Sequence, residues 1–259
     1  MGKGHTAELV RLNFQLGDNM SAMGGSALVG GMVFARELYH YFIPRKVGVY
    51  GPPMTGKTTL DRFMTTPGEM EEIPEDERTK HFRIPGMNRF LLPRPTRKRV
   101  SWKGDKRVVY SADIGGDERF WNLWIDDMVN RNVEAVIFMF DDRALRGGDE
   151  AIQAVGGFKY LVDGILHRQY RYRNLRSWFR GKRYCPKVIM LVANKADNWW
   201  DESANVLWQQ QRLGEHKMFD PFRDDLVRLQ KAGIPTRRGM MATRIGWNVE
   251  NTLIDILTM

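Results

Sequence analysis

Residues 46–59 read Lys46-Val47-Gly48-Val49-Tyr50-Gly51-Pro52-Pro53-Met54-Thr55-Gly56-Lys57-Thr58-Thr59. The pattern G-x-x-x-x-G-K-[ST] runs from Gly51 to Thr58 and follows an apolar stretch with the composition of a β-strand. A strand that ends in a glycine-rich turn directs successive backbone N–H groups inward, where they can cradle phosphate oxygens. The sequence therefore predicts a phosphate-binding loop, from Gly51 to Thr59, between a strand and a helix.

Two side chains of this loop carry the predicted chemistry. Lys57 can reach the β- and γ-phosphates of a nucleotide as a point charge, and the Thr58 hydroxyl can ligate Mg²⁺. The helix that begins near Lys57 adds the positive end of its dipole. An ordinary glycine-proline turn before a helix is the alternative. The combination of strand, glycine spacing and Lys-Thr pair disfavours it.

The composition is that of an α/β domain with extensions. The chain has 259 residues, of which 42% are hydrophobic, which is enough for a core. Cys185 is the single cysteine, so no internal disulfide can form, which suits a reducing compartment such as the cytoplasm. The formal net charge of +9 predicts an anionic partner without indicating its kind.

Residues 1–45 are expected to form an N-terminal extension to a main domain over 46–259. Within the extension, Met20 to Ala35 carries no charge and is rich in Gly, Ala, Met and Val. About sixteen residues are fewer than a membrane-spanning helix needs. Three interpretations stay open: a helix that packs on the domain or on a partner, a membrane anchor at the cytoplasmic face, and a flexible lead.

Apolar strand-like runs alternate with helical patterns after residue 45, which predicts an α/β fold with a mostly parallel sheet covered on both faces. The expected strands are Lys46–Tyr50, Arg97–Trp102, Arg107–Ala112, Val133–Phe140, Lys187–Ala193 and Gly239–Thr243, and the expected helices are Thr58–Thr65, Glu118–Arg131, Asp149–His167 and Asn248–Met259. The second and third strands are expected to form a hairpin around Lys103–Lys106. The segments 67–95 and 201–237 are expected to be insertions.

Two further motifs narrow the class of nucleotide-binding protein. Asp113-Ile114-Gly115-Gly116 follows the third expected strand, where Asp113 can hold Mg²⁺ through water and the Gly116 N–H can sense a γ-phosphate. Asn194-Lys195-Ala196-Asp197 follows the fifth.

The second of these motifs predicts the base. The Asp197 carboxylate can accept from both the ring N–H and the amino group of guanine, whereas adenine lacks that pair of donors. Asn194 can support the guanine edge, and the Lys195 stem can lie over the base. An Asn-Lys turn after a strand is common on its own, but the order of the three motifs predicts a guanine nucleotide, GTP or GDP.

With these motifs the chain resembles the Ras superfamily of small GTP-binding proteins, over roughly Lys46 to Met259. Residues 242–249, Ala-Thr-Arg-Ile-Gly-Trp-Asn-Val, are similar to the family's S-A-K-x-G-x-N-V, which implies a backbone contact from Ala242 and Thr243 to guanine. The motif at Asp113, followed by Trp121–Trp124, is most similar to the Arf branch or to the beta subunit of the signal recognition particle receptor. The resemblance implies a six-stranded P-loop G domain, Mg²⁺ and a GTP/GDP switch.

The chain departs from the family pattern at two places. The family often has Gln directly after D-x-x-G to orient the attacking water, and this chain has Asp117. A carboxylate there predicts slow intrinsic hydrolysis or a catalytic group from a partner. Thr96 stands roughly where the family's Mg²⁺-sensing threonine lies, and Thr79 is a poorer candidate; Thr96 as a simple strand-entry residue is the alternative.

Partners are predicted from charge and aromatic residues. The run from His167 to Tyr184 interleaves arginines with aromatic side chains. It suits a solvated helix, an anionic membrane surface or a partner protein, and nucleic acid is the least favoured of these. Trp121 and Trp124 lie where an effector or regulator would contact the switch regions, and we expect one to be exposed and one buried.

Two functional hypotheses result. The first is a GTPase switch that slowly converts GTP to GDP and phosphate, with Lys57, Gly116 and Asp117 as the catalytic candidates. The second is a GTP-bound interaction or scaffold module, in which Asp117 makes hydrolysis negligible. An ATPase or kinase is a third class, and it predicts no preference for guanine.

Overall fold

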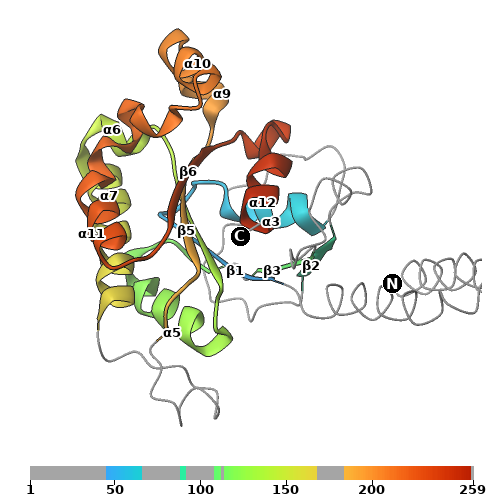
Figure 1. The fold of residues 1–259 in the computed structure, drawn as a ribbon, viewed down its shortest axis with the longest axis vertical. Helices are drawn as coiled ribbons and strands as arrows, with labels where there is room; N and C mark the ends of the chain where they lie inside the picture. The colour runs from blue at the N-terminus through green and yellow to red at the C-terminus, as the bar shows by residue number, and fades with distance from the viewer. Residues whose placement is uncertain (1–44, 66–87, 92–107, 112–113, 168–183, 258–259) are drawn as a thin grey trace, which may run out of the picture. The chain divides into compact units, whose positions relative to one another are not determined.

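The computed structural model describes residues 45–65, 88–91, 108–111, 114–167 and 184–257 (Figure 1). The extension 1–44, Thr96, Asp113 and the basic run 168–183 lie outside these ranges, so the domain boundary at residue 45 stays a prediction. Within the described ranges, no helix combines the length and the apolar character that crossing a membrane requires.

One sheet with the strand order β2-β3-β1-β4-β5-β6 forms the centre of the described fold (Figure 1). Its strands are β1 (Arg45–Tyr50), β2 (Asn88–Leu91), β3 (Val108–Ser111), β4 (Ala135–Phe140), β5 (Val188–Ala193) and β6 (Thr236–Met240). β2 runs antiparallel to β3, and every other neighbouring pair is parallel. The predicted α/β class with a mostly parallel sheet is confirmed. The parallel strands bring their carboxyl ends to one edge of the sheet.

Helices cover both faces of this sheet (Figure 1). α5 (Trp121–Arg131), α7 (Gly148–Leu166) and α11 (Arg223–Lys231) lie on one face, and α3 (Lys57–Thr65) and α12 (Val249–Leu257) lie on the other. The remaining helical elements are α6 (Arg143–Arg146), α9 (Ala196–Trp199), α10 (Glu202–Gln209), and the 3₁₀ segments η2 (Glu118–Phe120), η3 (Leu213–Glu215), η4 (Lys217–Phe222) and η5 (Thr243–Ile245).

The neighbouring strands β4 and β5 are apolar without interruption because both of their faces are buried. In β4, the side chains of Val136, Phe138 and Phe140 join the core under α5, α7 and α11. The alternate residues of the same strand, including Ile137 and Met139, join the core under α3 and α12. The two cores hold the strand ends, and the loops that follow them, in fixed positions.

The predicted pairing of the third strand with Arg97–Trp102 is wrong, and Arg97–Trp102 itself lies outside the described residues. The strand that pairs with β3 is β2, with Asn88 opposite Ser111 and Leu91 opposite Val108, rather than Arg97–Trp102. β2 has four residues and lies at the edge of the sheet, so its main-chain pairing with β3 is not displayed by a hydrophobic pattern in the sequence. Thr96 follows this strand in the chain, and because it lies outside the described residues its role as a Mg²⁺ ligand stays a prediction.

The other predicted elements differ from the observed ones mainly at their ends. β6 begins at Thr236, three positions before the predicted Gly239, and α12 is Val249–Leu257. Part of the segment 201–237 is built into the core and the sheet. Leu226 and Leu229 of α11 are core residues, and Thr236 begins β6. α9, α10, η3 and η4 lie between β5 and α11.

Asp201 caps the first turn of α10. Its Oδ1 accepts hydrogen bonds from the Ala204 N–H and the Ser203 hydroxyl, each at 2.8 Å. The bond from the Ala204 N–H is the main reason that the pKa of Asp201 falls from 3.8 to about 2. Because the pKa of Asp201 is lower in the folded state, its ionised carboxylate stabilises the fold at pH values above the unfolded-state pKa of 3.8. This contribution is lost as the pH falls through the folded-state pKa of about 2.

We expect Asp201→Ala to lower the free energy of unfolding by about 1 kcal/mol at pH 7, because a helix loses its cap. The difference from wild type should shrink as the pH falls from about 4 towards the folded pKa of about 2. Urea denaturation at several pH values measures both effects. Asp201→Asn keeps the capping oxygen and is expected to retain most of the stability; an equal loss in both variants would contradict the capping role.

Candidate functional site

Three loops meet at the carboxyl edge of the sheet, each following one of three adjacent parallel strands. Gly51 follows β1, Asp141 follows β4 and Asn194 follows β5. The Asn194 N–H donates to the carbonyl of Phe140 at 2.7 Å, which sets the second and third loops side by side. Ligands of open α/β sheets bind at this edge, and the predicted phosphate and guanine loops are both there.

The backbone of the phosphate loop is closely packed on its neighbours. Gly51 has a φ of 142°, and a Cβ at this position would lie 2.0 Å from the carbonyl oxygen of Met139. Gly56 has a φ of 90°, and a Cβ there would lie 2.3 Å from the side-chain nitrogen of Asn194. Both glycines are therefore required by conformation and by space.

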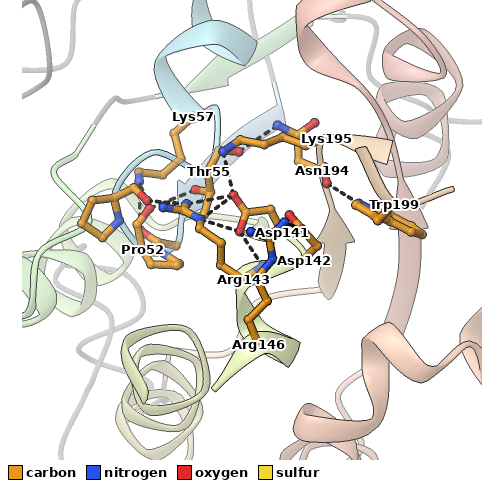
Figure 2. Close-up of polar contacts among 12 residues, drawn as sticks. Pro52, Thr55, Lys57, Asp141, Asp142, Arg143, Arg146, Asn194, Lys195 and Trp199 are labelled. Atoms are coloured by element: carbon orange, nitrogen blue, oxygen red, sulfur yellow. Dashed lines mark hydrogen bonds and ion pairs between the residues drawn. The ribbon is translucent and has the colours of Figure 1, made fainter. Parts of the chain in front are cut away.

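Lys57, the first residue of α3, turns back over this loop (Figure 2). Its Nζ donates to the carbonyl oxygens of Gly51, at 2.9 Å, and Pro52, at 2.7 Å. The Thr55 hydroxyl also donates to the Pro52 carbonyl, at 2.9 Å. Pro52 and Pro53 have no N–H groups, so the donors that the loop can offer a phosphate begin at Met54 and continue to Thr58 and Thr59 in the first turn of α3.

Asn194 fastens the phosphate loop to the loop after β6. Its Nδ2 donates to the carbonyl of Thr55 at 2.8 Å and to the Thr243 hydroxyl at 3.0 Å, while its Oδ1 accepts from the Thr243 N–H at 3.0 Å. The side chain is 1% exposed. Asn194 thus supports the predicted base site by joining three loops.

Asp197 is the last residue of the predicted guanine loop, Asn194–Asp197, and lies in the first turn of α9. Its carboxylate is exposed, and no hydrogen bond or ion pair reaches it from the residues that the structure describes. Lys195 precedes it in the left-handed conformation, with φ 55° and ψ 40°, and its Nζ lies 2.8 Å from the buried carboxylate of Asp141. The Asp197 carboxylate is therefore available to a ligand, and the Lys195 side chain is held by Asp141.

The backbone amides of Ala242 and Thr243 already have acceptors. Ala242 donates to the carbonyl of Trp247 at 3.1 Å, and Thr243 donates to Asn194. A contact from either amide to guanine would require one of these bonds to be exchanged. The predicted role of the two residues stays a prediction, with Thr243 clearly a partner of Asn194.

The Ile114–Gly116 segment lies directly against the phosphate loop. A Cβ on Gly116 would lie 2.4 Å from the carbonyl oxygen of Gly51 and from the carbonyl carbon of Pro52. The Trp124 indole holds the segment by donating to the Gly115 carbonyl at 3.0 Å. Of the three predicted metal ligands, Thr58 is described, at the start of α3; Asp113 and Thr96 are not.

The Asp117 carboxylate is bonded to Arg119. It caps η2, accepting from the Arg119 N–H at 3.0 Å, and it pairs with the Arg119 guanidinium at 2.8 Å and 3.2 Å. These hydrogen bonds from Arg119 lower the pKa of the carboxyl. The carboxylate is therefore ionised at neutral pH and already occupied.

The helix that follows is anchored in the core. Trp124 is fully buried, whereas Trp121 is half-buried and packs on Tyr160 of α7, with ring centroids 5.5 Å apart. The Tyr50 hydroxyl donates to Asp127 of α5 at 2.7 Å, which ties this helix to the end of β1. Of the two tryptophans, then, only Trp121 is placed where a partner could reach part of its ring.

Trp199 and Trp200, which follow Asp197, anchor the α10 segment. Trp199 donates to the Asn194 carbonyl at 2.8 Å and its ring lies 5.6 Å from that of His216. Trp200 packs at 5.0 Å on Trp247 and at 6.2 Å on Trp208 of α10. The base loops and the α10 segment are therefore in direct contact.

Asp141 and Arg143 were not anticipated from the sequence. Asp141 is 2% exposed and accepts hydrogen bonds from the Arg143 guanidinium at 2.8 Å (Figure 2). Burial raises the pKa of the Asp141 carboxyl, but the hydrogen bonds from Arg143 and Lys195 outweigh burial, and the pKa is lowered. The signal that could have found Asp141 is its place directly after a buried parallel strand.

No family model matches the chain, and no curated protein matches it. Among solved structures, the chain is similar to a bacterial selenocysteine-specific elongation factor, EF-Sec (17% identity, TM-score 0.45), covering 83% of this chain and 28% of that one. It is also similar to the Arl6 BBS3 small GTPase of Trypanosoma brucei with the bound nucleotide analogue GppNp, at 16% identity and a TM-score of 0.43. That match covers 83% of this chain and 98% of the other. A third similar structure is the apo form of the translation elongation factor SelB of Methanococcus maripaludis, at 15% identity and a TM-score of 0.44. That match covers 83% of this chain and 35% of the other.

The chain spans 28% and 35% of the lengths of the two elongation factors. Identities of 15–17% and TM-scores of 0.43–0.45 do not extend the activities of these proteins to this chain. Its motifs and the geometry of the three loops carry the functional inference.

Proposed function

We propose that this chain binds GTP and GDP with Mg²⁺ and acts as a nucleotide-dependent switch. The observation that carries the proposal is the junction at Asn194, whose side chain bonds the phosphate loop at Thr55 and the η5 loop at Thr243. A phosphate-binding loop and a loop bearing an exposed carboxylate, Asp197, are thereby joined at one sheet edge. That arrangement suits a ligand with phosphates at one end and a guanine base at the other.

The choice of guanine rests on Asp197. Its carboxylate can accept from the ring N–H and the amino group of guanine, and a bound adenine would leave the carboxylate without those donors. Titration of nucleotide-free protein with GTP and with ATP tests the proposal, together with the identity of the nucleotide that copurifies. Equal affinity for ATP and GTP would show that the guanine assignment is wrong.

Of the oxygen ligands proposed for Mg²⁺, the structure describes Thr58. The Thr58 hydroxyl at the start of α3 is a hard oxygen ligand of the kind that Mg²⁺ accepts with phosphate oxygens. Asp113, three residues before Gly116, is the proposed second protein contact, through water. When bound, the ion would neutralise phosphate charge, and Lys57 would contribute a second positive charge from the protein.

We propose slow hydrolysis of GTP, with a partner supplying what this chain lacks. The alternative, a non-hydrolysing GTP-bound scaffold module, is favoured by one observation: Asp117 is bonded to Arg119 and caps η2. Lys57 and Gly116 lie at the phosphate loop and can stabilise charge in either case. In both cases the Asp117 carboxylate, as positioned, does not supply a free general base.

We expect Asp117→Asn to leave the rate of GTP hydrolysis within about threefold of wild type. A general base contributes about 10²–10⁴-fold, and Asn keeps the ability to cap η2 while it removes the negative charge. Single-turnover hydrolysis with Mg²⁺ measures the rate. A loss of 100-fold or more would identify Asp117 as a catalytic base, and no phosphate release from wild type, with or without its partner, would favour the scaffold module.

The partner surfaces are proposed from the described aromatic residues. Trp121 and Tyr160 form an aromatic pair at the junction of α5 and α7. We propose this region for an effector or regulator protein. A peripheral place at the cytoplasmic face of a membrane, through residues 1–45 or the basic run 168–183, is the proposed location.

A further inference from the structure

The most densely bonded group at the sheet edge is a side chain outside the three motifs. Asp141 is the first residue after β4, the strand between those that lead into the phosphate loop and the guanine loop. Its carboxylate accepts from Arg143 Nε at 2.8 Å and Nη2 at 2.8 Å, and it lies 2.8 Å from the Nζ of Lys195. Two cations therefore share one buried carboxylate.

The two cations touch different nucleotide loops. Arg143 also donates through Nη2 to the carbonyl of Pro53 at 3.0 Å, so it is bonded to the phosphate loop (Figure 2). Lys195 belongs to the guanine loop, two residues before Asp197, and has the left-handed backbone conformation. Asp141 therefore connects the phosphate loop, through Arg143, with the guanine loop, through Lys195, and it does so independently of Asn194.

We propose that Asp141 is a positioning residue for guanine nucleotide: it holds Lys195 and Arg143 so that both loops are arranged before the nucleotide arrives. This inference rests on the proposed function. A long side chain that is ordered in the free protein loses no further freedom on binding, which increases affinity. The Lys195 stem can then lie over the base, and the Pro53 carbonyl is fixed at the tip of the phosphate loop.

Because the Asp141 carboxylate is buried, its removal is expected to act on Lys195 and Arg143 in particular. Removing the carboxylate charge leaves two cations beside each other with no anion between them, and such a pair separates where it can. Lys195, whose side chain is 31% exposed, would swing into solvent, whereas Arg143, 21% exposed, keeps its bond to Pro53. The guanine loop would lose its ordered lysine before the fold is lost.

Asp141→Asn is the test, with Asp142→Asn as its matched control. The neighbouring carboxylate of Asp142 pairs with the exposed Arg146, and within the part of the chain that the structure describes it makes no hydrogen bond to either nucleotide loop. Titration with fluorescent GDP and GTP analogues is expected to show about tenfold weaker binding for Asp141→Asn and no change for Asp142→Asn. Asp141→Glu, which keeps the charge, is expected to recover part of the loss.

A double-mutant cycle separates positioning from a general structural role. If Asp141 acts through Lys195, then Asp141→Asn and Lys195→Met affect the same interaction, and the double variant binds little more weakly than Lys195→Met alone. Additive losses would overturn the proposal. Should Asp141→Asn not fold, Arg143→Gln replaces it, with the exposed Arg146→Gln as control, and an affinity equal to wild type would overturn the proposal in the same way.

The outcomes also distinguish this inference from the proposed function. If wild-type protein binds no guanine nucleotide, the proposed function is wrong and the positioning role falls with it. If wild type binds GDP and GTP and Asp141→Asn binds them equally well, only the positioning role is wrong.

Discussion

Replacing Asp197 with asparagine is expected to remove the preference for guanine over adenine nucleotides and to weaken GTP binding about 100-fold. The carboxylate accepts two hydrogen bonds from guanine in the proposed complex. An asparagine side chain would instead turn its NH₂ group towards one guanine donor, so that two donors face each other. A base with a carbonyl at C2, such as xanthine, would accept from that NH₂ group and should bind the variant better than guanine does.

Calorimetric titration of both proteins with GTP, ATP and xanthosine triphosphate measures this change of specificity. Asp197 is exposed and makes no bond to the described residues, so the variant should keep its stability within about 0.5 kcal/mol. Asn198→Ala, at the next exposed position of α9, is the control and should bind GTP as wild type does. Unchanged GTP affinity in the Asp197 variant would place the base elsewhere.

Gly51→Ala is expected to lower the free energy of unfolding by about 3 kcal/mol or more and to abolish nucleotide binding. Two effects add at this position. A φ of 142° is strained for any residue with a Cβ, and the new methyl group would lie 2.0 Å from the backbone oxygen of Met139 in β4. Because Met139 belongs to the buried centre of the sheet, the loop must move, and the cradle for phosphate is lost.

Gly233→Ala isolates the first of these effects. Gly233 has a φ of 75°, and no atom lies within 4 Å of the position where its Cβ would be. This variant should lose about 1–2 kcal/mol through backbone strain alone and bind nucleotide normally. Thermal and urea unfolding of both variants, followed by titration with a fluorescent nucleotide, make the comparison. Similar losses in the two variants would mean that the contact with Met139 is relieved by relaxation.

The anchoring of α5 limits which residues can move when nucleotide binds. Trp124 and Asp127 hold this helix to Gly115 and to Tyr50. A change of conformation on nucleotide binding would therefore be concentrated in the residues between Gly116 and Phe120, which include Asp117. The half-buried Trp121 lies at the end of that segment, where such a change would be felt by a partner.

Much of the fold followed from local sequence. β4 and β5 are continuous apolar runs, and the glycine spacing from Gly51 to Gly56 could be matched to a phosphate loop without knowledge of the sheet. β2 was misplaced because an edge strand of four residues depends on pairing with β3, which leaves no periodic pattern. The predicted contacts of Ala242 and Thr243 with guanine stay a prediction, and the hydrogen bond from the Thr243 amide to Asn194 could be seen only in the tertiary structure.

By itself, the sequence determined the α/β class, the phosphate loop and the order of the motifs, because each depends on residues that are neighbours along the chain. Only the tertiary structure decided what lies between those motifs. Asp141 meets Lys195, and Arg143 meets Pro53, across strands and loops that are far apart in the sequence. Such contacts depend on strand order and register: Arg143 is near Asp141 along the chain, but Lys195 reaches the same carboxylate only because the sheet places the ends of β4 and β5 side by side.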